Sequence, residues 1–463
     1  MIKPLIWFRH DLRIRDQPAL QGAITPKTNS AIALFIITPQ QWKRHGWGAP
    51  RVSFLLGSLD VLRQELDALN IPLVVLQCDL FTHVPAIVLQ ACMEYQCDTV
   101  HAGREFGIDE HRRDQVTSRL LQDNDIEFKL HEPQTIIPVD QIRTQTGKSY
   151  SVFTPFRRRW ETIVRQTTFC TDTPRRISPP NTLQVPTVPK TVDGYEPWPG
   201  ATQWLAETKH AHKRLEEFLS GTIDHYHSAR DRPDIKGTSS LSPWLAVGAL
   251  SPKTCLHALL NRYGTDMTQW PSGPRAWQGE LVWREFYRHV MAANRNVSMG
   301  HPMQAWTENI QWRNDSNGFE AWCRGRTGVP IVDAGMKQLV TIGWMHNRVR
   351  MITAMFLVKN LLIDWRRGED YFARMLVDYD FPSNNGGWQW AASCGSDAAP
   401  YFRIFNPARQ AKIVDPSASY IDFWLSKTEA DRPSKPIVDL ATSRKRAIEM
   451  FKSTYKRWKA STP

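Results

Sequence analysis

Paired cysteines and long hydrophobic runs are absent from this sequence. No stretch reaches the roughly 18 apolar residues that a membrane span needs, and the segment MIKPLIWFRHDLRIRD carries charges too early for a secretory signal. The seven cysteines are an odd number with no C-x-x-C pair and no zinc or iron–sulfur spacing, so we expect reduced thiols and no metal site. These absences predict a cytoplasmic, nucleoid-associated protein.

Positive charge is present in excess, because 58 Lys and Arg face 46 Asp and Glu, a formal net charge of +12. Hydrophobic residues at 41% and charged residues at 22% are typical of globular proteins and exclude a disordered or fibrous chain. The basic balance favours a polyanionic partner such as nucleic acid, although a basic enzyme with a small phosphorylated substrate has the same composition. The length of 463 residues suits two or three domains.

The first 132 residues alternate short apolar runs with helical patterns, which is typical of βαβ units and a doubly wound parallel sheet. Between Val52 and Leu69 apolar residues recur at steps of three and four, which predicts an amphipathic crossover helix. No G-x-G-x-x-G motif follows any expected strand, so a dinucleotide site of the Rossmann kind is not indicated. The expected strands cover residues 4–8, 31–37, 72–76, 99–102 and 126–130.

The remaining chain follows two other patterns. Seven prolines among polar residues between Pro174 and Pro199 cannot sustain a helix or a central strand, and they indicate a linker over the surface. Beyond it, apolar residues follow a 3.6-residue period over 213–219, 279–294 and 335–363. We therefore expect an α/β domain over residues 1–132, a long interdomain linker over 133–203 and an all-helical domain over 204–463.

Two helical segments carry candidate binding residues. Glu280, Trp283 and Arg284 stand at i, i+3 and i+4, so a carboxylate, a flat ring and a cation share one helix face. This set suits a planar heterocycle, but an ion pair between Glu280 and Arg284 beside a half-buried Trp explains the same spacing and is more common. Asn347 and Met351 repeat the i, i+4 spacing with an amide that can bind a base or a flavin edge, or they belong to an ordinary helix.

The segment DYDFPSNNGGWQWAASCGSDAAPYFRIFNP, residues 378–407, is denser in polar and aromatic residues. A helix that begins near Asn385 places Asn384 and Trp388 on one side and Trp390 on roughly the opposite side. The segment could then contact two ligands. A capped loop before a core helix accounts for the polar residues but not for both tryptophans.

A fourth segment, residues 225–252, places hydroxyl groups after Gly237. A hydroxyl-rich turn that enters a helix can bind phosphate through backbone N–H groups, although ordinary helix capping is the more common use of Ser and Thr. The residues concerned are Thr238, Ser239, Ser240 and Ser242.

These four segments, in this order and behind a doubly wound domain, resemble the photolyase and cryptochrome family. The resemblance extends from WFRHDLR at 7–13 to RIFNP at 403–407, and its blocks WREFY, HNRVRM, NNGGWQWAAS and DAAPYFRIFNP are jointly improbable by chance. It implies an N-terminal α/β antenna-binding domain and a C-terminal helical FAD-binding domain.

The resemblance implies a site for reduced FAD in a folded shape. Arg350 and Asp378 match a pair beside the isoalloxazine ring, and Asn384 matches the position facing N5, where an amide favours the reduced flavin. The residues implied on the phosphate and ribose side are Tyr226, Thr238, Ser239, Ser240, Leu241 and Ser242. Those implied around the rest of the flavin are Trp277, Glu280, Arg284, Asn347, Asp378, Asp380 and Asn384.

A DNA site and an electron path are implied in the same way. Trp388, Trp365 and Trp312 match the three tryptophans through which the family photoreduces flavin. Arg230 is expected near the DNA backbone, and Arg157–Arg159 is either a basic rim or a solvated face. The residues implied at the lesion are Glu280, Trp283, Asn347, Arg348, Met351 and Trp390, with Glu280 as hydrogen-bond partner of the dimer carbonyls.

An antenna pigment is also expected between the two domains. His45, Asp109 and Glu110 match positions that hold 5,10-methenyltetrahydrofolate in the bacterial folate type. Near Met299 and His301 that type often has Cys and Lys, and this chain has neither. Folate is the first expectation, and a deazaflavin or an empty site are the alternatives.

Single positions separate the branches of this family. The (6-4) photoproduct branch carries His at the positions of Asn347 and Met351, and plant cryptochromes typically place Asp where Asn384 stands. The sequence therefore favours a class I cyclobutane pyrimidine dimer photolyase, a lyase that repairs UV-damaged DNA by electron transfer from excited reduced FAD to a flipped dimer. The alternatives are a cryptochrome-type blue-light sensor without repair activity and a plain electron-transfer flavoprotein. We expect a monomer without an obligate protein partner and without membrane association.

Overall fold

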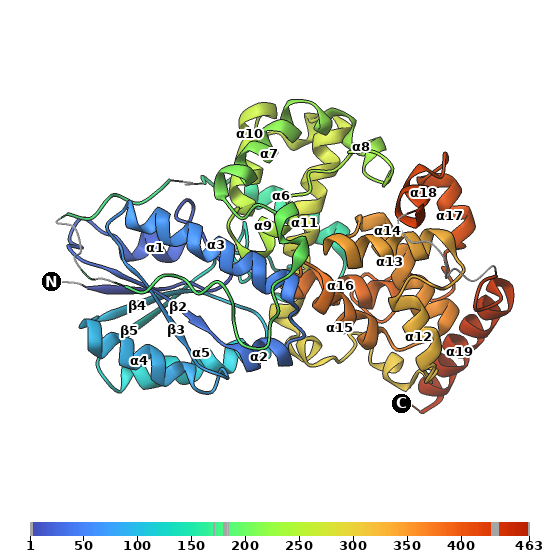
Figure 1. The fold of residues 1–463 in the computed structure, drawn as a ribbon, viewed down its shortest axis with the longest axis horizontal. Coiled ribbons are helices and arrows are strands. Elements are labelled where there is room, and N and C mark those ends of the chain that lie inside the picture. Colours follow the sequence, from blue (N-terminus) through green and yellow to red (C-terminus); the bar gives the residue numbers. More distant parts are fainter. Residues whose placement is uncertain (1–2, 170–171, 179–182, 184, 427–434, 462–463) are drawn as a thin grey trace.

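A five-stranded parallel sheet forms the N-terminal part of the molecule, with strand order β3-β2-β1-β4-β5 (Figure 1). The computed structural model describes residues 3–461 apart from 170–171, 179–182, 184 and 427–434. Each expected strand is present, with bounds within one residue of the prediction. The strands are β1 (Pro4–Trp7), β2 (Ile32–Ile37), β3 (Leu73–Gln77), β4 (Thr99–Gly103) and β5 (Glu127–His131).

Helices cover both faces of the sheet, so the doubly wound prediction is confirmed (Figure 1). Successive strand residues point to opposite faces. Ile6 and Phe35 therefore belong to the core under α1 and α3, whereas Trp7 and Leu34 belong to the core under α4 and α5. The helices here are α1 (Pro18–Ala23), α2 (Pro39–Arg44), α3 (Ala49–Asp67), α4 (Val84–Tyr95) and α5 (Ile108–Gln122).

The stretch over residues 133–203 is not uniformly irregular. It contains helix α6 (Phe153–Val164), whose Phe156 and Trp160 are buried in the main core, and the short 3₁₀ helix η1 (Pro199–Gln203). Pro179 and Pro180 of the expected linker lie outside the described residues. The domain boundaries stay predictions, and α6 packs as part of the helical core.

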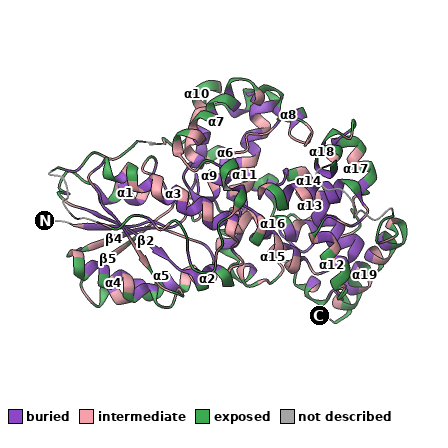
Figure 2. Cartoon of the chain, viewed as in Figure 1, coloured by how far each residue is buried: buried purple, intermediate pink, exposed green. Residues whose placement is uncertain are grey.

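Beyond residue 203 the described chain consists of helices and irregular segments, with buried residues running through its centre (Figure 2). None of the described helices is both long and apolar enough to cross a membrane. The α-helices are α7 (Thr208–Ser220), α8 (Tyr226–Ala229), α9 (Ser242–Val247), α10 (Pro252–Tyr263), α11 (Ser272–Ala293), α12 (Ser316–Cys323), α13 (Pro330–Ile342), α14 (Asn347–Met355), α15 (Trp365–Met375), α16 (Phe381–Ala391), α17 (Pro407–Val414), α18 (Ser419–Ser426) and α19 (Leu440–Ser461). Shorter 3₁₀ or π turns are η2 (Thr222–His225), η3 (Met267–Gln269), η4 (Arg295–Met299), η5 (Ala305–Asn309) and η6 (Phe356–Leu361).

The periodic stretch 335–363 is helical, as its pattern predicts, but it is divided among three elements. Gly343 ends α13 with a φ of 63°, in the left-handed region that favours glycine. The side chain of His346 then accepts a hydrogen bond from the backbone N of Arg348 and caps the start of α14. The turn η6 continues α14 as a π-helix.

The start of α16 also needs correction. The helix begins at Phe381, four residues before the expected start near Asn385. The Asp380 side chain accepts a hydrogen bond from the backbone N of Ser383 and caps the helix there.

The cysteines are free thiols where the structure describes them. Burial raises the pKa of Cys92, Cys97, Cys255 and Cys323 to about 12, which makes them unreactive at neutral pH. Cys170 lies outside the described residues. The free cysteines are Cys78, Cys92, Cys97, Cys255, Cys323 and Cys394.

Candidate functional site

A cavity of about 150 Å³ lies between α14, α15 and α16. Asn384 and Trp388, one helical turn apart on α16, both line it, as their spacing predicts. Trp390 is not among its lining residues, and its ring lies 6.4 Å from that of Phe405. Seven residues implied by the resemblance meet in this cavity, namely Asn347, Arg350, Met351, Asp378, Asp380, Asn384 and Trp388.

An ion pair forms the polar edge of this cavity. Nη2 of Arg350 lies 2.8 and 3.0 Å from the two carboxylate oxygens of Asp378. Asp380 binds Arg288 of α11. Burial opposes the charge of Asp380, but Arg288 and Arg284 outweigh it and hold its pKa far below the usual range. The carboxylate of Asp380 is therefore ionised, and arginine side chains hold both carboxylates in place.

The cavity suits the ring system of a flavin. Phe372, Leu376 and Trp388 supply apolar walls, while Arg350 and the amide of Asn384 supply donors and an acceptor at the edge. The Nδ2 of Asn384 donates to the backbone oxygen of Glu369 at 3.0 Å, which fixes the orientation of the amide. The donor set thus fits the ring that the resemblance assigns to these residues.

A second cavity, of about 360 Å³, brings together Arg230, Glu280 and Trp283. Nη1 of Arg230 lies 2.7 Å from Oε1 of Glu280. Burial raises the pKa of Glu280 although Arg230 opposes the rise. Arg348 binds Asp231 with two hydrogen bonds of 3.0 and 2.6 Å, and Nε of Arg230 lies 4.0 Å from the same carboxylate.

The alternative interpretation of the spacing, an ion pair between Glu280 and Arg284, is wrong. Arg284 donates to the backbone oxygens of Gln134 at 2.8 Å and Leu245 at 3.0 Å. Burial and the neighbouring Arg288 lower its pKa to about 9. Arg230, the residue after α8, reaches Glu280 instead, and the spacing of residues on α11 gives no sign of this contact.

The hydroxyl-rich turn lies between α8 and α9. Ser240 has a φ of 49°, and its hydroxyl lies 3.4 Å from that of Thr238. The hydroxyl of Ser242, the first residue of α9, accepts from Nε1 of Trp344 at 3.2 Å. Ser239 and Leu241 complete the turn, and Leu241 is buried. The phosphate role of this turn stays a prediction.

The aromatic residues implied at the flavin and along the electron path differ in burial. Trp388 and Trp365 are buried, whereas Trp312 is partly exposed at the edge of the core. Tyr226 and Trp277 are buried, and each packs against Phe218, with ring centroids 5.6 and 5.0 Å away. Exposure therefore increases from Trp388, which lines the first cavity, to Trp312.

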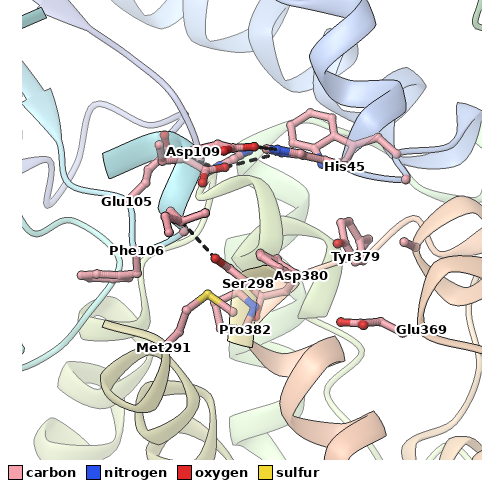
Figure 3. Close-up of a pocket in the computed structure, with 18 of the residues that line it drawn as sticks. His45, Glu105, Phe106, Asp109, Met291, Ser298, Glu369, Tyr379, Asp380 and Pro382 are labelled. Atoms are coloured by element: carbon pink, nitrogen blue, oxygen red, sulfur yellow. Dashed lines mark hydrogen bonds and ion pairs between the residues drawn. The ribbon is translucent and has the colours of Figure 1, made fainter. Parts of the chain in front are cut away.

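A third cavity, of about 500 Å³, is lined by residues of both parts of the molecule (Figure 3). Nε2 of His45 lies 3.2 Å from Asp109, and its Nδ1 lies 3.5 Å from Glu110. Burial opposes a charge on His45, but the two carboxylates outweigh it and raise the pKa of His45. Met299 lines the same cavity. The three residues expected to hold an antenna pigment are therefore together.

Sequence reasoning missed Arg288 and Glu369. Arg288 follows Arg284 by four residues, so the i, i+4 rule could have added it to the same face of α11. Glu369 accepts a hydrogen bond from Nδ2 of Asn385 at 2.9 Å, and burial raises its pKa to about 7. Nothing in the local sequence RRGEDYF signals that this carboxyl is buried.

The comparisons with known proteins agree with this arrangement. Residues 277–434 match the family model of the FAD binding domain of DNA photolyase, and residues 4–178 match the model of DNA photolyase. A deoxyribodipyrimidine photo-lyase of Vibrio cholerae is 40% identical over 91% of this chain and 89% of its own length. The one of Escherichia coli is 38% identical over 94% and 91%.

Solved structures show the same fold. A class III photolyase from Agrobacterium tumefaciens has a TM-score of 0.85 at 29% identity and covers 98% of both chains. A Synechocystis cryptochrome has a TM-score of 0.84 at 27% identity, with 97% and 99% covered. An archaeal photolyase from Sulfolobus tokodaii, solved with two FAD molecules, has a TM-score of 0.79 at 28% identity, with 98% and 100% covered.

A doubly wound sheet joined to a helical FAD-binding domain defines the class of this molecule. The chain belongs to the DNA photolyase family. Its enzyme class is that of the curated photo-lyases to which it is similar.

Proposed function

We propose that this protein repairs cyclobutane pyrimidine dimers in UV-damaged DNA with the energy of blue light. The proposal rests on the cavity at Arg230, Glu280 and Trp283, which we call the lesion cavity. It combines a carboxyl group, a cation and a flat apolar ring. Such a set suits a pyrimidine dimer flipped out of the duplex, a step known for photolyases as a class. The similarity to deoxyribodipyrimidine photo-lyases supports the choice of substrate.

The 150 Å³ cavity at Asn384, which we call the flavin cavity, and the turn at 238–242 would hold reduced FAD. The bound flavin would supply a single light-driven electron to the dimer. Arg350 and Asp378 would orient the ring through their ion pair. The Nδ2 of Asn384 already donates to the backbone oxygen of Glu369, so its amide oxygen would be the group left to accept from a protonated ring nitrogen. Trp388 closes one wall and excludes water. A hydrogen-bond acceptor such as the Asn384 oxygen would favour the reduced flavin, whose ring nitrogen carries a proton.

Glu280 is the group that would meet the developing negative charge on the dimer carbonyls. Burial raises its pKa, which favours the protonated carboxyl that would donate a hydrogen bond to those carbonyls. Arg230, now paired with Glu280 at 2.7 Å, would move to a DNA phosphate when the lesion is bound. Asn347, Arg348, Met351 and Trp390 would complete the lesion site, and of these Asn347 and Met351 also line the flavin cavity.

The experiment uses purified, reduced protein and UV-irradiated oligothymidine, with recovery of base absorbance followed in blue light and in the dark. We expect recovery only in light. Glu280→Ala should keep its flavin and lose at least about tenfold in repair per absorbed photon, as expected for loss of a charge-stabilising group, whereas Glu280→Gln should retain more. Equal yields in wild type and Glu280→Ala would contradict the role of Glu280.

A blue-light sensor without repair activity is the second candidate, and the similarity to the Synechocystis cryptochrome favours it. Trp388, Trp365 and Trp312 serve both functions, because both need photoreduction of the flavin. Bound, reduced flavin with flat base absorbance in the experiment above would select the sensor and withdraw the lesion roles of Glu280 and Trp390.

The cavity at His45, Asp109 and Glu110 is the proposed antenna site, with 5,10-methenyltetrahydrofolate as first choice. A fixed pair of carboxylates suits the N–H donors of a pterin-like ring. A deazaflavin is the alternative, and the two FAD molecules of the Sulfolobus tokodaii structure add a second flavin as another.

A further inference from the structure

Phe153 lies in none of the motifs discussed above, yet it makes the closest aromatic contact of the lesion cavity. Its ring is parallel to that of Trp283, with an interplanar angle of 2° and ring centroids 3.6 Å apart. Phe153 is 8% exposed and is not among the residues that line the cavity, whereas Trp283 is partly exposed and lines it. Phe153 therefore supports Trp283 from the side away from the cavity.

Two other rings contact that of Trp283, Phe286 edge-on at 81° and Tyr287 tilted at 33°. The centroid of the Trp283 ring lies 5.6 Å from that of Phe286 and 5.7 Å from that of Tyr287 on the same helix. Phe153 is the parallel ring among these three contacts. It therefore restricts the tilt of the indole plane most directly. A tryptophan with a fixed plane loses less rotamer freedom when a ligand binds against it.

Phe153 is itself anchored to the segment that follows α16. Its backbone N, at the first position of α6, donates to the carboxylate of Asp397 at 3.2 Å. The hydroxyl of Ser396 donates to the backbone oxygen of Ser151 at 2.6 Å. A carboxylate at a helix N-terminus is favourable because it meets the positive end of the helix dipole. The segment that follows the helix of Trp390 is thus hydrogen-bonded, through Asp397, to the backbone of the residue that stacks on Trp283.

We propose that Phe153 is a positioning residue for lesion recognition, which holds the indole of Trp283 in the plane that a flipped pyrimidine dimer packs against. The inference rests on the lesion role proposed above for Trp283. It adds that the two aromatic walls, Trp283 and Trp390, are set relative to each other by the contact of Phe153 with Asp397.

The test compares Phe153→Leu with Phe153→Tyr, which keeps the stacked ring. The dissociation constants for an oligonucleotide with one thymine dimer and for the undamaged strand are measured in the dark, and repair yield is measured at saturating DNA. We expect Phe153→Leu to weaken dimer binding about two- to tenfold, the range of one aromatic pair, with unchanged affinity for undamaged DNA and a nearly unchanged yield at saturation. Phe153→Tyr should match the wild type.

Trp283→Ala separates failure of this inference from failure of the proposed function. Wild-type binding by Phe153→Leu, with loss of dimer binding in Trp283→Ala, would overturn the inference alone. Wild-type binding by both variants would remove the lesion role of Trp283 as well. Equal losses for damaged and undamaged DNA, or the same loss in Phe153→Tyr, would show a general structural role and also overturn it.

Asp397→Ala provides a second variant, because it leaves the Phe153 ring in place and removes the carboxylate to which the backbone N of Phe153 donates. We expect a loss of dimer affinity in the same direction as in Phe153→Leu, and smaller. If Phe153→Leu does not fold, this variant decides, and unchanged dimer affinity in Asp397→Ala would count against the inference.

Discussion

Three arginines near α11 carry the same charge and are held in three different ways. Arg230 pairs with a carboxyl at the lesion cavity, Arg284 donates to two backbone oxygens, and Arg288 binds Asp380 beside the flavin cavity. Arg284 has its donors satisfied without an anion, so burial is able to lower its pKa to about 9. Among the three, Arg230 is the one that can exchange its partner for a phosphate, because its carboxyl partner is the one a substrate would engage.

The two adjacent glycines of the NNGG motif should respond in opposite ways to Ala. A Cβ at Gly386 would overlap the ring of Tyr287, whereas a Cβ at Gly387 meets nothing within 4 Å. The rings of Trp283 and Phe286 lie 5.7 and 5.8 Å from that of Tyr287 and limit its movement. We expect Gly386→Ala to destabilise the fold by about 1–3 kcal/mol, as overpacking does.

Gly387→Ala is the matched control in the same turn of α16, and it should stabilise the flavin-free protein by about 0.4–1 kcal/mol through the unfolded state. Urea unfolding of both variants and the wild type, each without flavin, measures the difference. Equal effects at the two positions would mean that α16 does not approach α11 as closely as the contact with Tyr287 requires.

At the scale of elements, the start of α14 depends on an unprotonated histidine. Nδ1 of His346 accepts from the backbone N of Arg348 at 3.2 Å, and burial lowers the pKa of His346 to about 4. The usual histidine value near 6.5 applies in the unfolded chain. The unfolded state therefore binds more protons between pH 4 and 6.5, so stability is full above pH 6.5 and falls as the pH drops towards 4.

His346→Asn tests this dependence, because Asn caps a helix without titrating. The wild type should lose about 3 kcal/mol more than the variant between pH 6.5 and 4, from 1.36 kcal/mol for each unit of pKa difference. His101, whose pKa burial and His131 also lower to about 4, titrates in both proteins and cancels. Parallel stability curves for the two proteins, from urea unfolding at each pH, would contradict the assignment.

The sheet was predictable because each strand is a short run with apolar residues between turns, and β1 and β2 are buried along their whole length. Their pattern can be recognised without knowledge of distant residues. The break at Gly343 and the π-helical turn η6 were not, because the apolar period continues across both. The pairing of Glu280 was missed for a related reason, since its partner Arg230 comes from another element. Seven residues named by family resemblance meet in the flavin cavity, but the resemblance gave no sign of Phe153.

At the scale of the whole molecule, the excess of positive charge can be assigned to particular residues. Arg157 lines the lesion cavity and binds Glu161 and Gln278, both at 2.8 Å, whereas Arg158 and Arg159 are exposed on α6. If the exposed pair forms a basic rim, each residue that contacts a phosphate releases about one counterion.

Arg158→Gln should therefore make the slope of log affinity against log salt shallower by about one, with equal loss for damaged and undamaged DNA. Arg159→Gln should act alike, and neither should change stability by more than about 0.5 kcal/mol, as is usual for surface positions. Titrations of oligonucleotide at several salt concentrations give the slopes. An unchanged slope in both variants would mean that Arg158 and Arg159 are solvated and do not contact DNA phosphates.

The antenna role proposed for the cavity between the sheet and the helical part would separate light collection from repair. His45, held by Asp109 and Glu110, lies on the sheet side of this cavity, and Asp370 lies on the side of α15. His45 and Asp370 do not line the flavin cavity or the lesion cavity. Loss of the His45 side chain should therefore leave both of those cavities intact.

His45→Ala should bind methenyltetrahydrofolate at least about tenfold more weakly, the effect of losing one charge-assisted hydrogen bond, while repair under direct flavin excitation stays unchanged. Asp370→Asn, on the opposite wall, is the control. Binding is followed by pigment absorbance and repair by its dependence on wavelength. If a deazaflavin or FAD binds in place of folate and this binding is lost in His45→Ala, the proposed site stands and the proposed pigment is wrong. If folate still binds to His45→Ala, the pigment binds elsewhere.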